Sequence, residues 1–124
     1  MIEEDYVSFE TAKLLKEKGF DGICRTAYET ITNEHEVEQC SLSSWGKLNQ
    51  AKRPTLQMAM KWLREVYNID IMVWVENYNG VKRYTSDCWK DVVQVDSQIH
   101  RSKRFPSYEE ACEAAIKYCL ENLI

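Results

Sequence analysis

The dipeptide Asn79-Gly80 constrains the fold of this chain more than any other local feature. Runs of alternating apolar residues flank it, over residues 69–76 and 81–89. A two-residue type I′ turn requires positive φ at both central positions, which Asn and Gly adopt most readily. The sequence therefore predicts a β-hairpin. Its register pairs Tyr78 with Val81, Glu76 with Arg83, Val75 with Tyr84 and Trp74 with Thr85.

This register sorts the hairpin side chains onto two faces, because successive residues of a strand point to opposite sides. One face, expected to pack on helices, holds Ile69, Ile71, Val73 and Val75. The other face holds Met72, Trp74, Tyr78, Val81 and Arg83. A sheet surface facing solvent is normally more polar than this, and exposed patches of Trp, Tyr and Met mark interaction sites. Two interpretations stay open: another part of the chain covers this face, or the face binds a partner or a second copy.

Three further segments show the apolar periodicity of amphipathic helices. The predicted helices cover residues 8–18, 54–68 and 107–122. Ser8 and Ser107 are favourable N-caps, since their hydroxyls accept hydrogen bonds from the first turn. Gly19 provides a stop for the first helix.

The remaining segments add strands and loops. Residues 23–31 are rich in β-formers and predict a strand, which a turn at Asn33 joins to an acidic strand ending near Cys40. Val92, Val93 and Val95 indicate a short extra strand. The segments 41–53 and 98–105 are expected to be loops. Together these elements predict a two-layer α+β fold, with about three helices on one face of a mostly antiparallel sheet of four to five strands.

The chain length and composition fit one globular domain over residues 1–124, with 44% apolar and 29% charged residues. No apolar run approaches the length of a membrane span, and the acidic start lacks the pattern of a signal peptide. The five cysteines are odd in number and form no C-x-x-C pair, which is typical of free thiols in a reducing compartment. A cytoplasmic protein without membrane contact is therefore expected.

Motifs for catalysis or cofactor binding do not occur in the sequence. None of the glycine-rich nucleotide-binding or nucleophile motifs is found around its four glycines. A zinc site drawn from Cys24, His35, Cys40 and Cys88 has spacings that match no standard pattern, so ordinary buried or half-buried thiols are the favoured interpretation. We therefore expect no enzyme activity, no cofactor and no metal.

A positively charged middle block, residues 41–104, stands out in a chain of net charge −4 and contains all four tryptophans. Its candidate nucleic-acid-binding residues are Lys82, Arg83, Arg101, Lys103 and Arg104. Aromatic rings stack on bases while Lys and Arg neutralise phosphates. The acidic segments elsewhere would repel a polyanion unless they face away, and a mixed-charge surface is the alternative interpretation.

Several segments together resemble a known group of proteins. These segments are Pro54 to Glu65, Asn68 to Ile71, Ser107 to Ala111, Tyr6 to Glu10 and Leu14 to Phe20. They resemble a group of short proteins of unknown function from gut anaerobic bacteria and their phages. The resemblance implies an intracellular protein of phage or mobile-element type. It transfers no catalytic residue, because the matching segments are mostly helix-forming signatures.

The leading hypothesis is a small, non-catalytic interaction protein that binds a protein partner or forms a homodimer. Its expected contact residues are Met72, Trp74, Tyr78 and Arg83. The alternative is a nucleic-acid-binding module that uses the basic region 82–104. A third hypothesis, a binder of small anionic ligands, has no motif behind it.

Overall fold

The computed structural model describes residues 2–30, 37–41, 50–95 and 103–124. The helices are α1 (Phe9–Glu17), α2 (Leu56–Tyr67) and α4 (Tyr108–Asn122). The strands are β1 (Thr26–Thr30), β2 (Val37–Ser41), β3 (Gln50–Lys52), β4 (Ile69–Tyr78), β5 (Val81–Lys90) and β6 (Val93–Gln94). The predicted α+β class is confirmed, and each of the three predicted helices is present.

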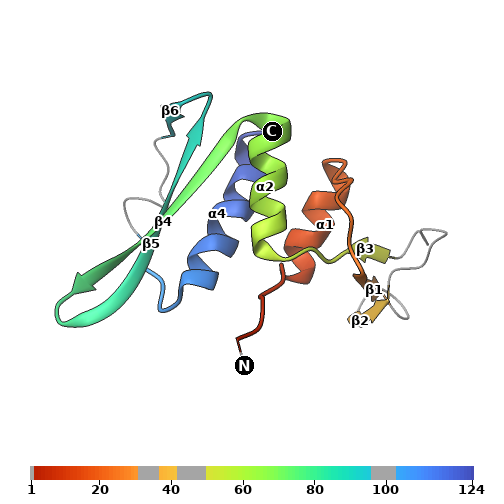
Figure 1. Cartoon of the computed structure of the whole chain (residues 1–124), viewed down its shortest axis with the longest axis horizontal. Helices are drawn as coiled ribbons and strands as arrows, with labels where there is room; N and C mark the ends of the chain where they lie inside the picture. The colour runs from red at the N-terminus through yellow and green to blue at the C-terminus, as the bar shows by residue number, and fades with distance from the viewer. Residues whose placement is uncertain (1, 31–36, 42–49, 96–102) are drawn as a thin grey trace.

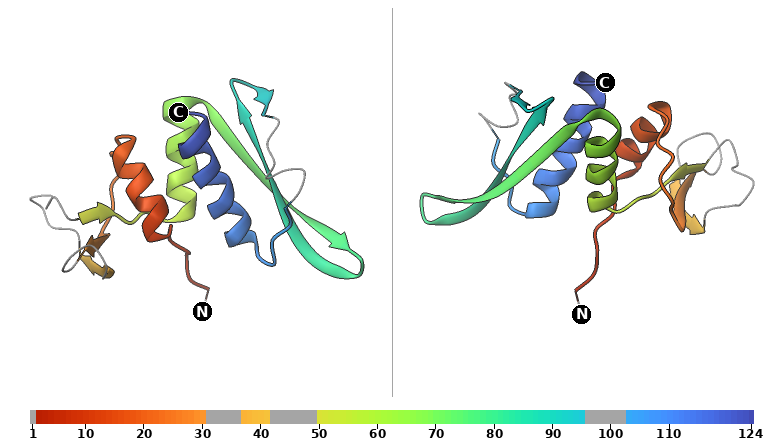
Figure 2. Two further views of the ribbon diagram at one scale, coloured as in Figure 1. Left: turned by 180° about the vertical axis from the view of Figure 1, so that it is seen from behind. Right: turned by 45° about the horizontal axis from the view of Figure 1, so that its top comes forward.

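The described strands form two antiparallel sheets, of order β2-β1-β3 and β4-β5-β6. The helices lie between the two sheets, with the β2-β1-β3 sheet on one side and the β4–β5 hairpin on the other (Figures 1 and 2). The sequence predicted a single sheet covered on one face, and this part of the prediction differs from the structure. The separation arises because α2 follows β3 almost directly and carries the chain across to the start of β4.

The segment predicted as a loop over 41–53 contains strand β3. Ala51 pairs with Tyr28 of β1 and is buried, as is its neighbour Gln50. Local propensity for a strand is weak here, so the pairing with β1 and the burial of Ala51 decide the conformation. Residues 42–49 of that predicted loop lie outside the described part of the chain.

Side-chain hydrogen bonds fix where the helices begin. Ser8 accepts from the backbone N–H of Thr11, and Ser107 accepts in the same way from Glu110. The second helix has Thr55 as its N-cap, one residue after Pro54. These caps satisfy N–H groups that have no partner within the helix.

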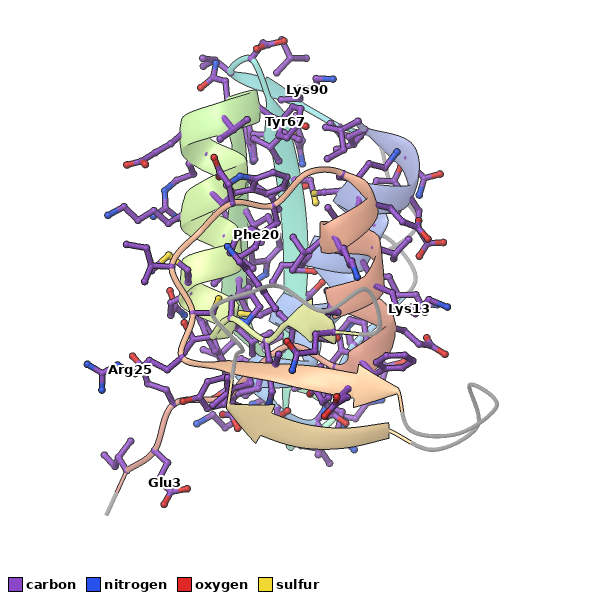
Figure 3. All side chains as sticks on the ribbon, turned by 90° about the vertical axis from the view of Figure 1, so that its right-hand side faces the viewer. Glu3, Lys13, Phe20, Arg25, Tyr67 and Lys90 are labelled. Atoms are coloured by element: carbon purple, nitrogen blue, oxygen red, sulfur yellow. The ribbon has the colours of Figure 1, made fainter. Side chains whose placement is uncertain are left out.

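The core joins residues from all three helices and from the β4–β5 hairpin. Its largest fully buried side chains include Leu15, Leu63, Ile69, Ile116 and Leu120. An aromatic row extends this core, since Trp62 makes edge contacts with Phe20 and Tyr67 at centroid distances of 5.4 and 5.2 Å. Figure 3 shows Phe20 between α1 and α2, and Tyr67 near the end of α2. Such offset aromatic pairs add to the stabilisation from burial alone.

Candidate interaction surface on the β4–β5 hairpin

Strands β4 and β5 pair along their whole length in the predicted register. Asn79 has φ 52° and Gly80 has φ 80°, as a type I′ turn requires. The distal half of the hairpin extends past the helices (Figures 1 and 2). We call residues 72–84 the hairpin arm. The turn chemistry therefore sets the register of the two strands.

Several large apolar side chains of the arm face solvent. Met72 is 53% exposed, Tyr78 is 49% exposed and Val81 is 46% exposed. Trp74 and Arg83 are half-buried. The sequence did not decide whether another part of the chain covers this face. Within the described part of the chain, the face is largely exposed along the arm.

Val75 corrects one detail of the predicted faces. It shares the face of Ile69, which is fully buried, yet it is 54% exposed. Burial on this face decreases from fully buried Ile69 through half-buried Ile71 and Val73 to exposed Val75, so the core covers only the base of the hairpin. The arm therefore presents apolar side chains on both of its faces.

The segment before α4 supports the arm from the side of β5. Tyr84 and Phe105 exchange two backbone hydrogen bonds, of 2.8 and 2.7 Å. Arg104 then reaches across to β4, where its Nε donates to Glu76 Oε2 at 2.7 Å and its guanidinium carbon lies 4.5 Å from the Tyr78 ring centre. The sequence predicted Arg83 as the partner of Glu76. The two residues are directly opposite in the register, but the ion pair with Glu76 is made by Arg104, and Arg83 Nη1 donates to the carbonyl of Lys82.

At the base of the hairpin, the face that holds Met72 and Trp74 is polar and covered. Thr85 and Asp87 are each only 2% exposed. Asp87 accepts from the backbone N–H of Cys88 and from the side-chain amide of Gln94, on the strand that follows. The Thr85 hydroxyl donates to the carbonyl of Lys103. Burial of polar groups at the base and exposure of apolar groups along the arm reverse the usual pattern of a soluble sheet.

Strand β4 forms an outer edge of its sheet. It has ten residues and no proline, and no described strand pairs with its outer side. Such an edge offers unpaired backbone N–H and C=O groups to a partner strand. Strand addition joins those hydrogen bonds to side-chain contacts at alternate positions.

The predicted nucleic-acid residues gather partly around Tyr84. Lys82 and Arg83 lie on β5, and the Tyr84–Phe105 bridge places Lys103 and Arg104 beside them. Lys82 Nζ lies 5.5 Å from the centre of the Tyr84 ring. The fifth predicted residue, Arg101, is outside the described residues. The bridge brings the two segments side by side, but Lys82 lies over Tyr84 on one face of β5, whereas Arg104 pairs with Glu76 on the face that holds Arg83.

The cysteines have the character of core residues. Cys88, Cys112 and Cys119 are fully buried, and Cys119 donates a hydrogen bond to Cys88 at an Sγ–Sγ distance of 3.5 Å. That hydrogen bond and burial raise the pKa of Cys119, which keeps the thiol protonated and unreactive. Among the described residues, no three His, Cys, Asp or Glu side chains are grouped as a metal site. His35 and the side chain of Cys40 fall outside the described set.

Neither a scan of protein-family models nor searches of curated proteins and solved structures gave a match to this chain. Within the described residues, no helix is long and apolar enough to cross a membrane.

Proposed function

We propose that this chain is a non-catalytic protein-interaction module whose contact surface is the hairpin arm. The observation that carries the proposal is the concentration of half-exposed apolar side chains on one projecting element. Single exposed apolar residues are normal on protein surfaces, whereas clustered ones mark contact sites. Met72, Trp74, Tyr78 and Arg83, which the sequence singled out, all belong to this arm.

The proposed mode of contact is strand addition along β4. A partner segment in extended conformation would pair with the outer backbone groups of β4. Its alternate side chains would meet Tyr78 on one face and Val75 on the other. Aromatic and Arg residues dominate the energetics of interfaces, so Tyr78 and the Arg104 stacked on it form the centre of the proposed surface. The first partner to test is a second copy of this chain.

Two valines provide a matched test. Val75 on the arm and Val66 on α2 are 54% and 56% exposed, and both can be changed to Glu without filling a buried site. Native mass spectrometry of protein purified gently from its host measures whether a dimer or a bound protein is present. We expect V75E and Y78A to remove the bound species and V66E to retain it. A complex that survives both arm variants would rule out this surface.

A second candidate function is nucleic-acid binding, favoured by the approach of residues 103–104 to Lys82 and Arg83. Phosphate contacts release counterions, so this function predicts steep salt dependence. Substituting Arg101, Lys103 and Arg104 by Ala would weaken binding to an oligonucleotide and flatten that dependence. Retention of a partner at high salt would favour the protein-interaction function instead.

A further inference from the structure

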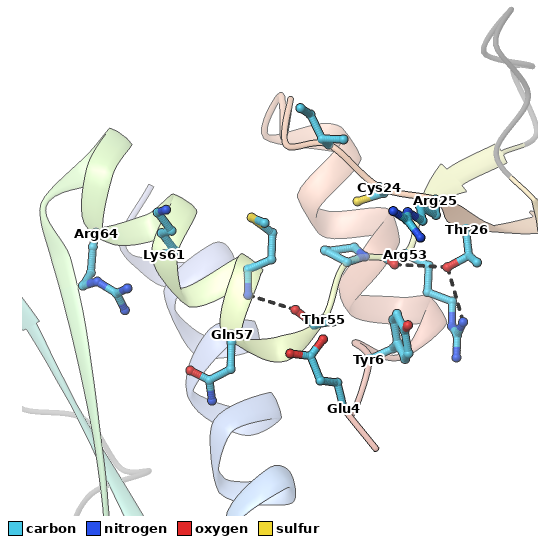
Figure 4. Close-up of a pocket in the computed structure, with 13 residues that line it drawn as sticks. Glu4, Tyr6, Cys24, Arg25, Thr26, Arg53, Thr55, Gln57, Lys61 and Arg64 are labelled. Carbon is cyan, nitrogen blue, oxygen red and sulfur yellow. Dashed lines mark hydrogen bonds between the residues drawn. The ribbon is translucent and has the colours of Figure 1, made fainter. Parts of the chain in front are cut away.

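A pocket of about 440 Å³ lies where α2 begins, between that helix and residues 23–26. The exposed face of α2 forms one wall, and the segment leading into β1 forms the opposite wall (Figure 4). A volume of this size is typical of sites for small molecules.

Long-range pairing holds the floor of the pocket in place. Tyr6 pairs with Thr55 as an isolated bridge, and the N–H of Leu56 donates to the carbonyl of Asp5 at 2.9 Å. Arg53 lies at the junction, with its guanidinium carbon 3.9 Å from the centre of the Tyr6 ring. Its Nη1 also donates to Thr26 Oγ1 at 3.3 Å. Three segments that are distant in the sequence therefore meet at one preformed site.

The walls of the pocket are positively charged. Lys61 and Arg64 lie on the α2 side, and Arg25 and Arg53 lie on the other (Figure 4). Glu4 is the single carboxylate among the lining residues. None of the four cations forms an ion pair with a carboxylate of the described residues. Because the chain as a whole is acidic, such an unneutralised group of cations favours an anionic ligand.

The start of α2 adds to the positive potential. Thr55, Gln57 and Met58 line the pocket, so the first turn of this 12-residue helix faces it, and that turn contains no acidic residue. Helix N-termini carry partial positive charge and attract phosphates.

The pocket is also partly apolar. Ile23 is 89% exposed, Tyr6 is 41% exposed and Met58 is 37% exposed, and all three line the site. Apolar side chains this exposed are costly to leave in water, and a flat organic body would cover them. The Gln57 Nε2 donates to the Tyr108 hydroxyl at 3.5 Å, which leaves its side-chain carbonyl as an acceptor for such a body. The lining thus matches a ligand with an anionic part and an aromatic part.

We infer that this pocket binds a nucleoside phosphate, with the phosphates between the cationic walls and the base against Tyr6 and Met58. Arg25 and Arg53 meet the phosphates from one wall, and Lys61 and Arg64 meet them from α2. Guanidinium groups suit this role because their donors match phosphate oxygens in pairs. This binding is independent of the hairpin arm.

Calorimetric titration of the full chain with ADP, and separately with inorganic pyrophosphate, tests the inference. Lys61 on α2 and Lys13 on α1 form a matched pair, since both are exposed helical lysines and only Lys61 lines the pocket. We expect ADP to bind more tightly than pyrophosphate. We expect K61E to weaken ADP binding by about tenfold or more, which corresponds to about 1.4 kcal/mol, and K13E to leave it within about twofold.

Three outcomes would overturn the inference: no binding of ADP, equal losses in K61E and K13E, or equal affinity for ADP and pyrophosphate. A circular-dichroism melt of each variant confirms that the fold is retained. Cys24, which lines the pocket, provides a second measurement. We expect saturating ADP to slow its alkylation by iodoacetamide several-fold, read for the Cys24 peptide by mass spectrometry. Unchanged ADP affinity in Y78A distinguishes this site from the arm.

Discussion

The hydroxyl of Thr11 in α1 donates to Glu113 Oε1 of α4 at 2.6 Å, across 102 positions of sequence. The same oxygen accepts from the backbone N–H of Ser8 at 3.0 Å. One carboxylate of the last helix therefore completes the N-terminal cap of the first helix. Thr11 is fully buried, so its hydroxyl depends on this acceptor.

We predict that Glu113→Ala lowers the free energy of unfolding by about 1–3 kcal/mol, because it leaves the Thr11 hydroxyl and the Ser8 N–H without an acceptor. Glu121→Ala is the control, since Glu121 is exposed on the same helix. Urea denaturation followed by circular dichroism measures both variants. Equal stability of the two variants would contradict the prediction.

Substitution of Arg104 tests how the arm is supported. Loss of its contacts with Tyr78 and Glu76 should make local opening of the arm easier by about 1 kcal/mol, the sum expected of one exposed cation–π contact and one exposed ion pair. Amide hydrogen exchange in R104A should therefore speed up over residues 75–84 and stay unchanged in α2. Uniform exchange changes throughout the chain would argue against a local role.

The turn of the arm is sensitive for a different reason. Gly80 has φ 80°, and an added Cβ would meet no atom within 4 Å. The cost of Gly80→Ala, about 1–2 kcal/mol, is therefore conformational rather than steric. We expect G80A to loosen the arm while the thermal unfolding midpoint shifts by only a few degrees.

Gly22→Ala makes a useful contrast, because its Cβ would lie 2.4 Å from the ring of Phe20. Phe20 is buried against Trp62, so a larger drop in global stability is expected there. If G80A destabilised the whole protein as much as G22A, the arm would have to be part of the cooperative core.

Thiol reactivity should separate the cysteines. Burial raises the pKa of Cys112 to about 11, with a hydrogen bond from Tyr108 opposing this rise. Burial also raises the pKa of Cys24 above the ordinary 9.0, and the charge of Lys52 partly offsets it. Because the thiolate is the reactive form, the alkylation rate of half-buried Cys24 should climb with pH and reach its midpoint above 9.0.

In native protein at pH 8, we expect Cys24 to react well before Cys88, Cys112 and Cys119, which should react only as fast as the chain unfolds. Peptide mass spectrometry after timed alkylation measures each site. Early labelling of Cys112 would show that the packing of α4 is looser than the structure indicates.

The ion pair between Glu10 and Lys117, with an Oε2–Nζ distance of 2.8 Å, predicts a pH dependence. The hydrogen bond and charge of Lys117 lower the pKa of Glu10, so its contribution to stability is present above pH 4.5 and is lost as pH falls further. Glu10 raises the pKa of Lys117, so that contribution is present below pH 10.5 and is lost as pH rises further.

The difference in stability between wild type and E10Q should therefore be largest near pH 7 and shrink as pH falls from 4.5 towards 3. Glu10 is exposed and Lys117 is half-exposed, so the difference will be small, and salt should reduce it. Denaturation curves at the two pH values and at two salt concentrations measure it. A difference at pH 3 as large as that at pH 7 would point to a role for Glu10 other than the ion pair.

Local chemistry explains which parts of the fold could be predicted. The hairpin register followed from Asn79-Gly80 alone, since the turn type fixes the pairing. The helix starts followed from Ser8 and Ser107, whose caps involve only neighbouring residues. The division into two sheets could not be predicted, because β3 becomes a strand only through its pairing with β1.

The pocket could not be predicted from the sequence either, because it depends on contacts between distant segments. Arg25, Arg53 and Lys61 belong to separate segments, and nothing in their spacing indicates that they line one site. Their meeting depends on the pairing of Tyr6 with Thr55. By contrast, the arm residues lie close in sequence and could be identified together. The exposure of Val75 was missed, since alternation shows the face of a strand and not how far a helix covers it.

The placement of one sheet on each side of the helices separates the two proposed binding surfaces. The arm and the pocket have no residue in common. If both proposals hold, a partner on the arm and a small anion in the pocket would bind through separate sets of residues. Any coupling between binding at the arm and binding in the pocket would have to pass through the helices between them.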